Sequence, residues 1–95
     1  MYIVFLRFSE NKAQAKEFMA DHNAWLNSGF EKGVFMLSGT IMPPQGGAII
    51  ANDIEFTDLQ NLVNEDPFVQ RNIVTAEIVE IAPSKTDSRL DFLSH

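Results

Sequence analysis

Hydrophobic and polar residues follow two different periodicities along this chain, and together they predict strands that alternate with helices. Segment 2–8 is rich in β-branched and aromatic residues, which is typical of a strand. Segments 34–42, 48–51 and 73–81 have a similar apolar character and bounding turn residues, and they predict three further strands.

Two other segments show the spacing of amphipathic helices. The first follows Ser9, a suitable N-cap, and is expected to end at Gly29, because glycine is common just past a helix end. The second covers residues 56–64, and Pro67 then disfavours helical geometry at Asp66, which is expected to be extended or in a turn. The order β-α-β-β-α-β predicts an α+β, ferredoxin-like fold, with a four-stranded antiparallel sheet and two helices on one face.

Apolar residues occupy both faces of the predicted strands. In segment 2–8, Val4 and Leu6 alternate with Ile3 and Phe5. A sheet face that is open to water normally carries polar residues at every second position. Large exposed apolar patches are uncommon on monomers, so the pattern favours sheet-on-sheet pairing in a homodimer or a higher oligomer. The alternative is a sheet that tolerates a few exposed hydrophobic residues.

Composition indicates one ordinary globular domain. The chain has 95 residues, of which 45% are hydrophobic and 21% are charged, which is enough for one core. We expect a single domain over residues 1–83 and a polar C-terminal tail over residues 84–95. The tail contains Leu90, Phe92 and Leu93, and it is expected either to dock on a neighbouring subunit or to be partly disordered.

The charge and the ligand-forming residues exclude several classes of function. The net charge of −6 and the scattered Lys and Arg residues argue against nucleic acid and against an anionic membrane surface. There is no cysteine, the histidines form no ligand cluster, and no nucleotide-binding glycine motif is present, so neither a metal nor a cofactor is expected. The apolar start is too short for a signal peptide, and no segment approaches a membrane span, which predicts a cytoplasmic protein. A small molecule or another protein is the expected partner.

One histidine, His22, lies in the apolar stripe of the first helix, between Met19 and Leu26. Periodicity alone favours a packed core histidine that bonds backbone carbonyls or buried water. The other interpretation places His22 at the edge of a pocket beside a carboxylate, since an unperturbed imidazole titrates at about 6.5 and suits proton transfer near neutral pH. Asp21 is adjacent but points in another direction on a helix. Asp66 is the best remote partner, although periodicity does not place it within reach.

Four short patterns, in this order, resemble the YCII-like family of the dimeric α/β-barrel superfamily. They are His22-x-x-x-Leu26-x-x-Gly29, Ser38-Gly39, Gly47 and Asp66-Pro67-Phe68. The resemblance covers residues 2–82, and it implies ferredoxin-like protomers that pair through their open sheet faces, with a pocket where His22 and Asp66 meet. Family members often carry arginine or another polar residue shortly before the histidine. This chain has Phe18, Met19 and Ala20 there, so we expect a more apolar pocket mouth.

The resemblance also implies elimination or isomerisation of a small cyclic or aromatic molecule, and hence a cofactor-independent lyase or isomerase. His22 would move the proton and Asp66 would fix the imidazole tautomer. Ser38, Phe68 and Trp25 are the predicted substrate-binding residues, with Ser38 limited to a hydrogen bond. The alternative is a non-catalytic dimer that binds a ligand or a protein, in which the His22–Asp66 pair is structural.

Overall fold

The computed structural model describes residues 1–93, and its elements follow the predicted order. The strands are β1 (Tyr2–Phe8), β2 (Phe35–Thr40), β3 (Gly46–Ala51) and β4 (Val74–Glu80). The helices are α1 (Ala15–Glu31), α2 (Phe56–Asn64) and α3 (Pro67–Gln70), with the 3-10 turns η1 (Lys12–Gln14) and η2 (Ser88–Leu93). The sequence did not predict α3 or η2. It predicted that the first helix follows Ser9, whereas α1 begins at Ala15, after the turn η1, and its N-cap is Gln14.

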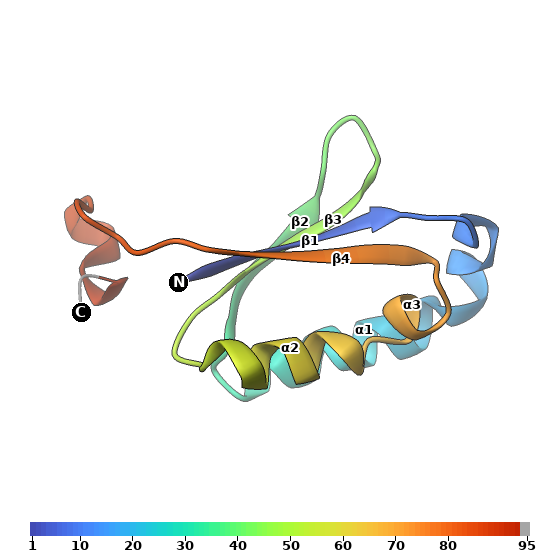
Figure 1. The fold of residues 1–95 in the computed structure, drawn as a ribbon, viewed down its shortest axis with the longest axis horizontal. Helices are drawn as coiled ribbons and strands as arrows, with labels where there is room; N and C mark the ends of the chain where they lie inside the picture. The colour runs from blue at the N-terminus through green and yellow to red at the C-terminus, as the bar shows by residue number, and fades with distance from the viewer. Residues whose placement is uncertain (94–95) are drawn as a thin grey trace.

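Within residues 1–93, the strands form one antiparallel sheet in the order β2-β3-β1-β4. Helices α1, α2 and α3 all lie on the same side of this sheet (Figure 1). The ferredoxin-like α+β fold predicted from the sequence is therefore confirmed. Because β1 pairs with both β3 and β4, its residues lie at the centre of the sheet, and Val4 faces Ile49 on one neighbour and Ile78 on the other.

The core lies between the sheet and the helices. Val4 and Ile49 contribute from the strands, Leu59 contributes from α2, and Ile73 precedes β4; all of these side chains are buried. Burying an aliphatic side chain of this size stabilises the fold by about 1.5–3 kcal/mol. This layer holds α1 and α3 against the sheet, and these two helices carry the candidate site.

Helix α1 continues beyond Gly29, where the sequence predicted its end, and stops at Glu31. Gly29 is buried inside the helix, and a Cβ there would collide with the ring of Phe35. The helix is ended instead by Gly33, which has φ of 73° and donates to the carbonyl of Phe30, while Val34 donates to the carbonyl of Gly29. This is a Schellman termination. The sequence prediction ended the helix at Gly29, which is required for packing, rather than at Gly33, which adopts the left-handed conformation.

The outer face of the sheet, away from the helices, carries a continuous aliphatic row. Strand register places Leu37, Ile50, Ile3 and Val79 side by side across β2, β3, β1 and β4. Leu37 is 53% exposed and Val79 is 36% exposed. The prediction of apolar residues on both sheet faces is confirmed by this arrangement.

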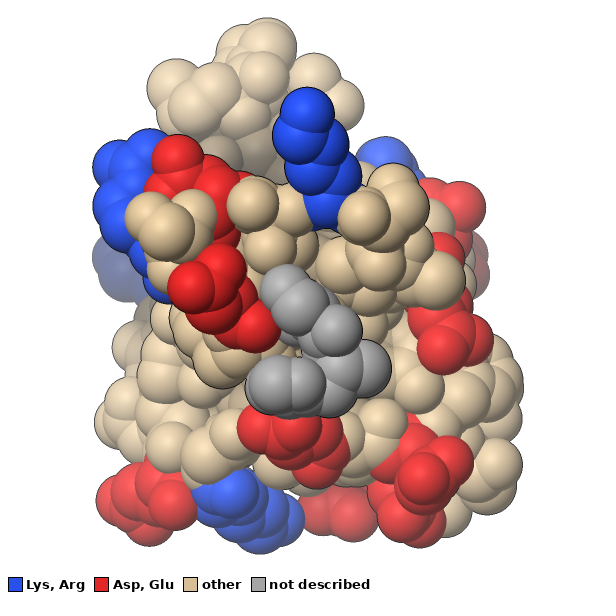
Figure 2. All heavy atoms as spheres, turned by 90° about the vertical axis from the view of Figure 1, so that its left-hand side faces the viewer, with Lys and Arg blue, Asp and Glu red and all other residues tan. Residues whose placement is uncertain are grey.

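The C-terminal segment leaves the sheet after β4. Figure 1 shows residues 84–93 apart from the helical layer, with η2 at the end of an extended stretch. Leu90 and Phe92 are exposed, whereas Leu93 is buried. Residues 94–95, which complete the predicted tail and include the second histidine, lie outside the described residues. Figure 2, which looks onto this end of the molecule, shows acidic side chains spread over the surface and basic ones isolated among them.

None of the helices within residues 1–93 combines the length and the apolar character that crossing a membrane requires.

Candidate functional site

The structure brings His22 of α1 and Asp66 together, although 44 positions separate them in the chain. His22 Nδ1 lies 2.8 Å from Asp66 Oδ1. The Asp66 side chain is completely buried, and the His22 side chain is 12% exposed. The pair therefore has one inaccessible member and one that reaches a surface.

Local chain geometry holds the Asp66 carboxylate in place. Asp66 is the N-cap of α3, with the extended conformation predicted for a residue before proline (φ −63°, ψ 123°), and Pro67 occupies the first helical turn. The backbone N–H of Phe68 donates to Asp66 Oδ1 over 3.0 Å. The same oxygen thus caps the helix and meets His22. The segment Asp66-Pro67-Phe68 follows the end of α2 at Asn64 and begins the short helix α3.

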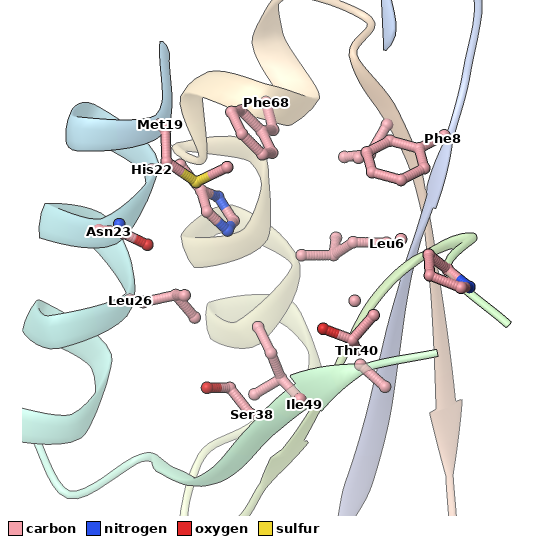
Figure 3. A pocket seen from close by; sticks show the side chains of 16 residues that line it. Leu6, Phe8, Met19, His22, Asn23, Leu26, Ser38, Thr40, Ile49 and Phe68 are labelled. Atoms are coloured by element: carbon pink, nitrogen blue, oxygen red, sulfur yellow. The ribbon is translucent and has the colours of Figure 1, made fainter. Parts of the chain in front are cut away.

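The pairing determines which nitrogen of His22 is available to a ligand. A carboxylate can only accept, so in the neutral ring the proton lies on Nδ1 and Nε2 keeps its lone pair. Figure 3 shows the His22 ring directed into a cavity between α1 and the sheet. Nε2 is consequently placed to accept a proton from a bound molecule.

Two aromatic rings restrict the orientation of the imidazole. Phe68 stacks on His22 with ring centroids 4.0 Å apart and an interplanar angle of 5°. Trp25 lies on the same helix, 5.8 Å from His22 between centroids. The Trp25 indole N–H donates to the carbonyl of Leu62 over 2.9 Å and is buried. Trp25 therefore supports His22 from the core.

The cavity has a volume of about 320 Å³ and lies between α1 and the strands. Its apolar walls include Leu6, Phe8, Leu26, Ile49, Phe68 and Val74. Its polar side chains are His22, Asn23, Ser38 and Thr40.

Two of the predicted substrate-binding residues, Ser38 and Phe68, line this cavity, and Trp25 lies outside its described lining. Substrate contact is therefore not proposed for Trp25. Trp25 lies in the apolar stripe of the first helix, and this position already indicated burial in the core.

Asn23 and Thr40 also line the cavity, and neither was predicted from the sequence. Thr40 could have been found from strand alternation, because it lies two residues after Ser38 and shares its face.

A glycine makes room for the cavity at its strand wall. Gly47 of β3 faces Leu6 and Thr40 on its neighbouring strands, on the helix-covered side of the sheet. A Cβ at this position would come within 3.3 Å of the carbonyl oxygen of Gly39 and would meet no side chain within 4 Å. Any larger side chain at position 47 would extend toward the helices and fill the space.

The described residues 1–93 contain no cluster of three or more His, Cys, Asp or Glu side chains suited to hold a metal ion. The chemical resources of the site are thus the imidazole, its buried carboxylate partner, the hydroxyls of Ser38 and Thr40, and the amide of Asn23.

Comparison with known proteins identifies a similar fold. No protein-family model and no curated protein matches this sequence. A solved structure does: 5-chloro-2-hydroxyhydroquinone dehydrochlorinase from Burkholderia phenoliruptrix AC1100, in complex with 2,5-dihydroxybenzoquinone. The match has a TM-score of 0.69 at 15% sequence identity and covers 85% of this chain and 93% of that chain. The two proteins share a fold.

Proposed function

We propose that the chain is a small-molecule enzyme in which His22 is the general base and Asp66 is its positioning residue. The supporting observation is the 2.8 Å contact between His22 Nδ1 and the buried Asp66 Oδ1 at the edge of a mostly apolar cavity. A carboxylate on Nδ1 holds one tautomer and stabilises the imidazolium that forms when Nε2 takes a proton.

The proposed reaction is an elimination or an isomerisation of a small cyclic or aromatic molecule. His22 Nε2 accepts a proton from a C–H or O–H group of the bound ring. In an elimination, the released electron pair forms a new double bond and the leaving group departs with its bonding pair. In an isomerisation, the imidazolium returns the proton to another atom of the same molecule. Neither route needs a redox cofactor. The structural neighbour is a dehydrochlorinase of 5-chloro-2-hydroxyhydroquinone, and dehydrochlorination is an elimination on such a ring.

We further propose that the chain is a cytoplasmic homodimer of the YCII-like type. The aliphatic row formed by Leu37, Ile50, Ile3 and Val79 supports this assembly, because two such faces would exclude water when packed together.

The test is turnover by the purified protein and by a His22→Gln variant. The first substrate is 5-chloro-2-hydroxyhydroquinone, assayed by chloride release without oxygen, followed by other halogenated hydroquinones and unsaturated lactones. Loss of a general base lowers rates by about 10²–10⁴-fold. Asn27→Ala, on the exposed side of α1, is the control and should keep full activity. Turnover that survives His22→Gln would contradict the assignment.

A specific observation also favours the alternative of a non-catalytic binding module. Asp66 caps α3, and His22 stacks on Phe68, so the pair holds α1 and α3 together even without chemistry. In that case His22→Gln would cause a clear loss of unfolding free energy, and no compound in the panel would be turned over. For the enzyme, we expect the variant to remain folded and dimeric while turnover is lost.

A further inference from the structure

The charges of the residues that line the cavity indicate which ligand charge the site can accommodate. Among residues 1–93, the lining includes no lysine, arginine, aspartate or glutamate, and His22 is its one ionisable side chain. Behind His22 lies the buried carboxylate of Asp66. The pair therefore carries a net charge of −1 when the imidazole is neutral and zero when it is protonated. In neither state does the cavity offer an unpaired positive charge.

An anionic ligand would therefore lose part of its hydration without gaining an ionic partner. Transfer of an unpaired charged group into an apolar site is among the most costly events in recognition. Proteins that bind carboxylates or phosphates usually supply arginine, lysine or a helix N-terminus. The N-terminus of α3 is already capped by Asp66 itself. The electrostatics of this site consequently oppose carboxylates and phosphates.

The polar groups of the cavity lie on two opposite walls. His22 and Asn23 belong to α1, whereas Ser38 and Thr40 belong to β2 and project from the helix-facing side of the sheet. Figure 3 shows the first two on the helical side of the cavity and the other two on the strand side. Apolar side chains complete the lining, with Leu26 on α1, Leu6 on β1 and Phe68 on α3. A volume of about 320 Å³ is at the low end for small-molecule pockets and suits roughly one ring.

We infer that the site selects an uncharged ring carrying oxygen functions on two opposite edges. One edge donates a proton to His22 Nε2, and the other hydrogen-bonds to the hydroxyls of Ser38 and Thr40. That such a ring is also the substrate rests on the proposed function. That such a ring binds preferentially follows from the lining alone. Ser38 was already predicted to bind substrate, whereas Thr40 was not. We therefore assign Thr40 as a specificity-determining residue.

Three probes that differ by one group test the inference: hydroquinone, phenol and 4-hydroxybenzoate. Binding is measured from the backbone amide signals of Gly47, Ile49 and Phe68 in two-dimensional NMR titrations. We expect hydroquinone to bind about fivefold more tightly than phenol, which lacks the second hydrogen-bonding edge. We expect 4-hydroxybenzoate, which carries an unpaired charge, to bind at least about tenfold more weakly than hydroquinone. Equal binding of 4-hydroxybenzoate and hydroquinone would overturn the inference, as would failure of all three to shift these signals.

Variants of the strand wall identify the second edge. The double variant Ser38→Ala, Thr40→Val should bind hydroquinone and phenol equally, because the strand wall then offers no hydroxyl. Thr75→Val is the matched control, since Thr75 is a strand threonine on the outer face, opposite Arg7. This control should keep the fivefold preference. A preference that survives in the double variant would contradict the role given to Ser38 and Thr40.

A gain of binding provides an independent test of the charge argument. Met19 lines the cavity and is 42% exposed, so Met19→Lys places an ammonium at the mouth without burying it. We expect its affinity for 4-hydroxybenzoate to rise about threefold, as a partly exposed ion pair allows. Ala20→Lys adds the same charge to the next, exposed residue of α1 and is the matched control. An equal gain in both variants would show a non-specific effect of net charge and overturn the argument.

Different results would refute the ligand class and the enzymatic function. If the three probes bind in the expected order but no compound is turned over, the ligand class is supported and the proposed enzymatic function is refuted. Turnover of 5-chloro-2-hydroxyhydroquinone that depends on His22, together with equal binding of 4-hydroxybenzoate and hydroquinone, would keep the enzymatic function and refute the ligand class.

Discussion

At the residue scale, the Asp66 carboxylate combines two tasks that usually belong to different residues. Its Oδ1 accepts the backbone N–H of Phe68 and also meets His22 Nδ1, while the whole side chain is buried. Removal of a buried acceptor costs more than the bond itself is worth, because the donors it satisfied stay behind without water. Substitutions of Asp66 therefore separate its capping task from its charge.

We expect Asp66→Ala to lower the free energy of unfolding by about 3 kcal/mol, since it leaves two donors unpaired and removes a helix cap. Asp66→Asn should cost about 1 kcal/mol, because its side-chain oxygen can still cap α3. Urea denaturation followed by circular dichroism measures both values. Equal losses in the two variants would show that the cap contributes little.

The tautomer of His22 gives a second prediction at this scale. In the neutral ring, Nδ1 should carry the proton and Nε2 should be bare, because Asp66 accepts from Nδ1. Nitrogen-15 chemical shifts of the ring, recorded at alkaline pH, distinguish the two tautomers directly. In Asp66→Ala, which removes the acceptor, the population should move toward a proton on Nε2. A wild-type ring with its proton on Nε2 would exclude the proposed base.

At the scale of elements, the contact between α1 and β2 depends on a missing side chain. Gly29 is buried in α1 where the Phe35 ring packs, so the helix approaches the strand closely at this point. Glycine inside a helix lowers helix stability by about 1 kcal/mol relative to alanine, and close packing of α1 on Phe35 offsets this loss.

Gly29→Ala should therefore destabilise the protein by about 2 kcal/mol, even though alanine favours the helix, because the new methyl group displaces the Phe35 ring. Thermal unfolding measures the loss. Asn27→Ala, which lies two residues earlier at an exposed position, is the control and should be neutral or slightly stabilising. A stabilised Gly29→Ala would mean that Phe35 moves aside without cost.

The cavity wall at Gly47 supports a related prediction for β3. Gly47→Val should remain folded, since a β-branched residue suits a strand, with a small loss of stability because its Cβ comes within 3.3 Å of the Gly39 carbonyl oxygen, and it should fill part of the cavity. Hydroquinone binding, measured by the NMR titration described above, should weaken about tenfold or more. Unchanged binding would place the ligand elsewhere.

At the scale of the whole molecule, the sheet has one face packed on helices and one face that carries the aliphatic row of Leu37, Ile50, Ile3 and Val79. Such a row is unfavourable in water and favourable against a second copy of itself. The C-terminal segment after β4 stands apart from the helical layer and exposes Leu90 and Phe92 (Figure 1).

We expect the wild-type protein to sediment as a dimer and Leu37→Glu to sediment as a folded monomer. Leu37 lies at the β2 end of the aliphatic row, and a carboxylate buried there against a second sheet would lose its hydration, so it opposes association. Ala20→Glu, on the exposed surface of α1, introduces the same charge and should remain dimeric. Analytical ultracentrifugation with circular dichroism separates dissociation from unfolding. A wild-type monomer would refute the assembly.

The sequence predicted the fold well because local patterns carry it. The strand segments, the residues 56–64 of α2 and the extended conformation of Asp66 all follow from side-chain periodicity and proline sterics, which act over a few residues. The end of α1 was placed at the wrong glycine, since a glycine required for packing and one required for a left-handed turn are identical in sequence. The helix α3 was missed because its four residues are too few to show a period.

By itself, the sequence determined the order of the elements, the two apolar faces of the sheet and the presence of His22 on the packing side of α1. Only the tertiary structure decided that His22 meets Asp66, and that Asn23 and Thr40 share a cavity with Ser38. The physical reason is the range of the interactions. Periodicity reports which way a side chain faces within its own element, whereas the contacts of the site depend on how separate elements pack together.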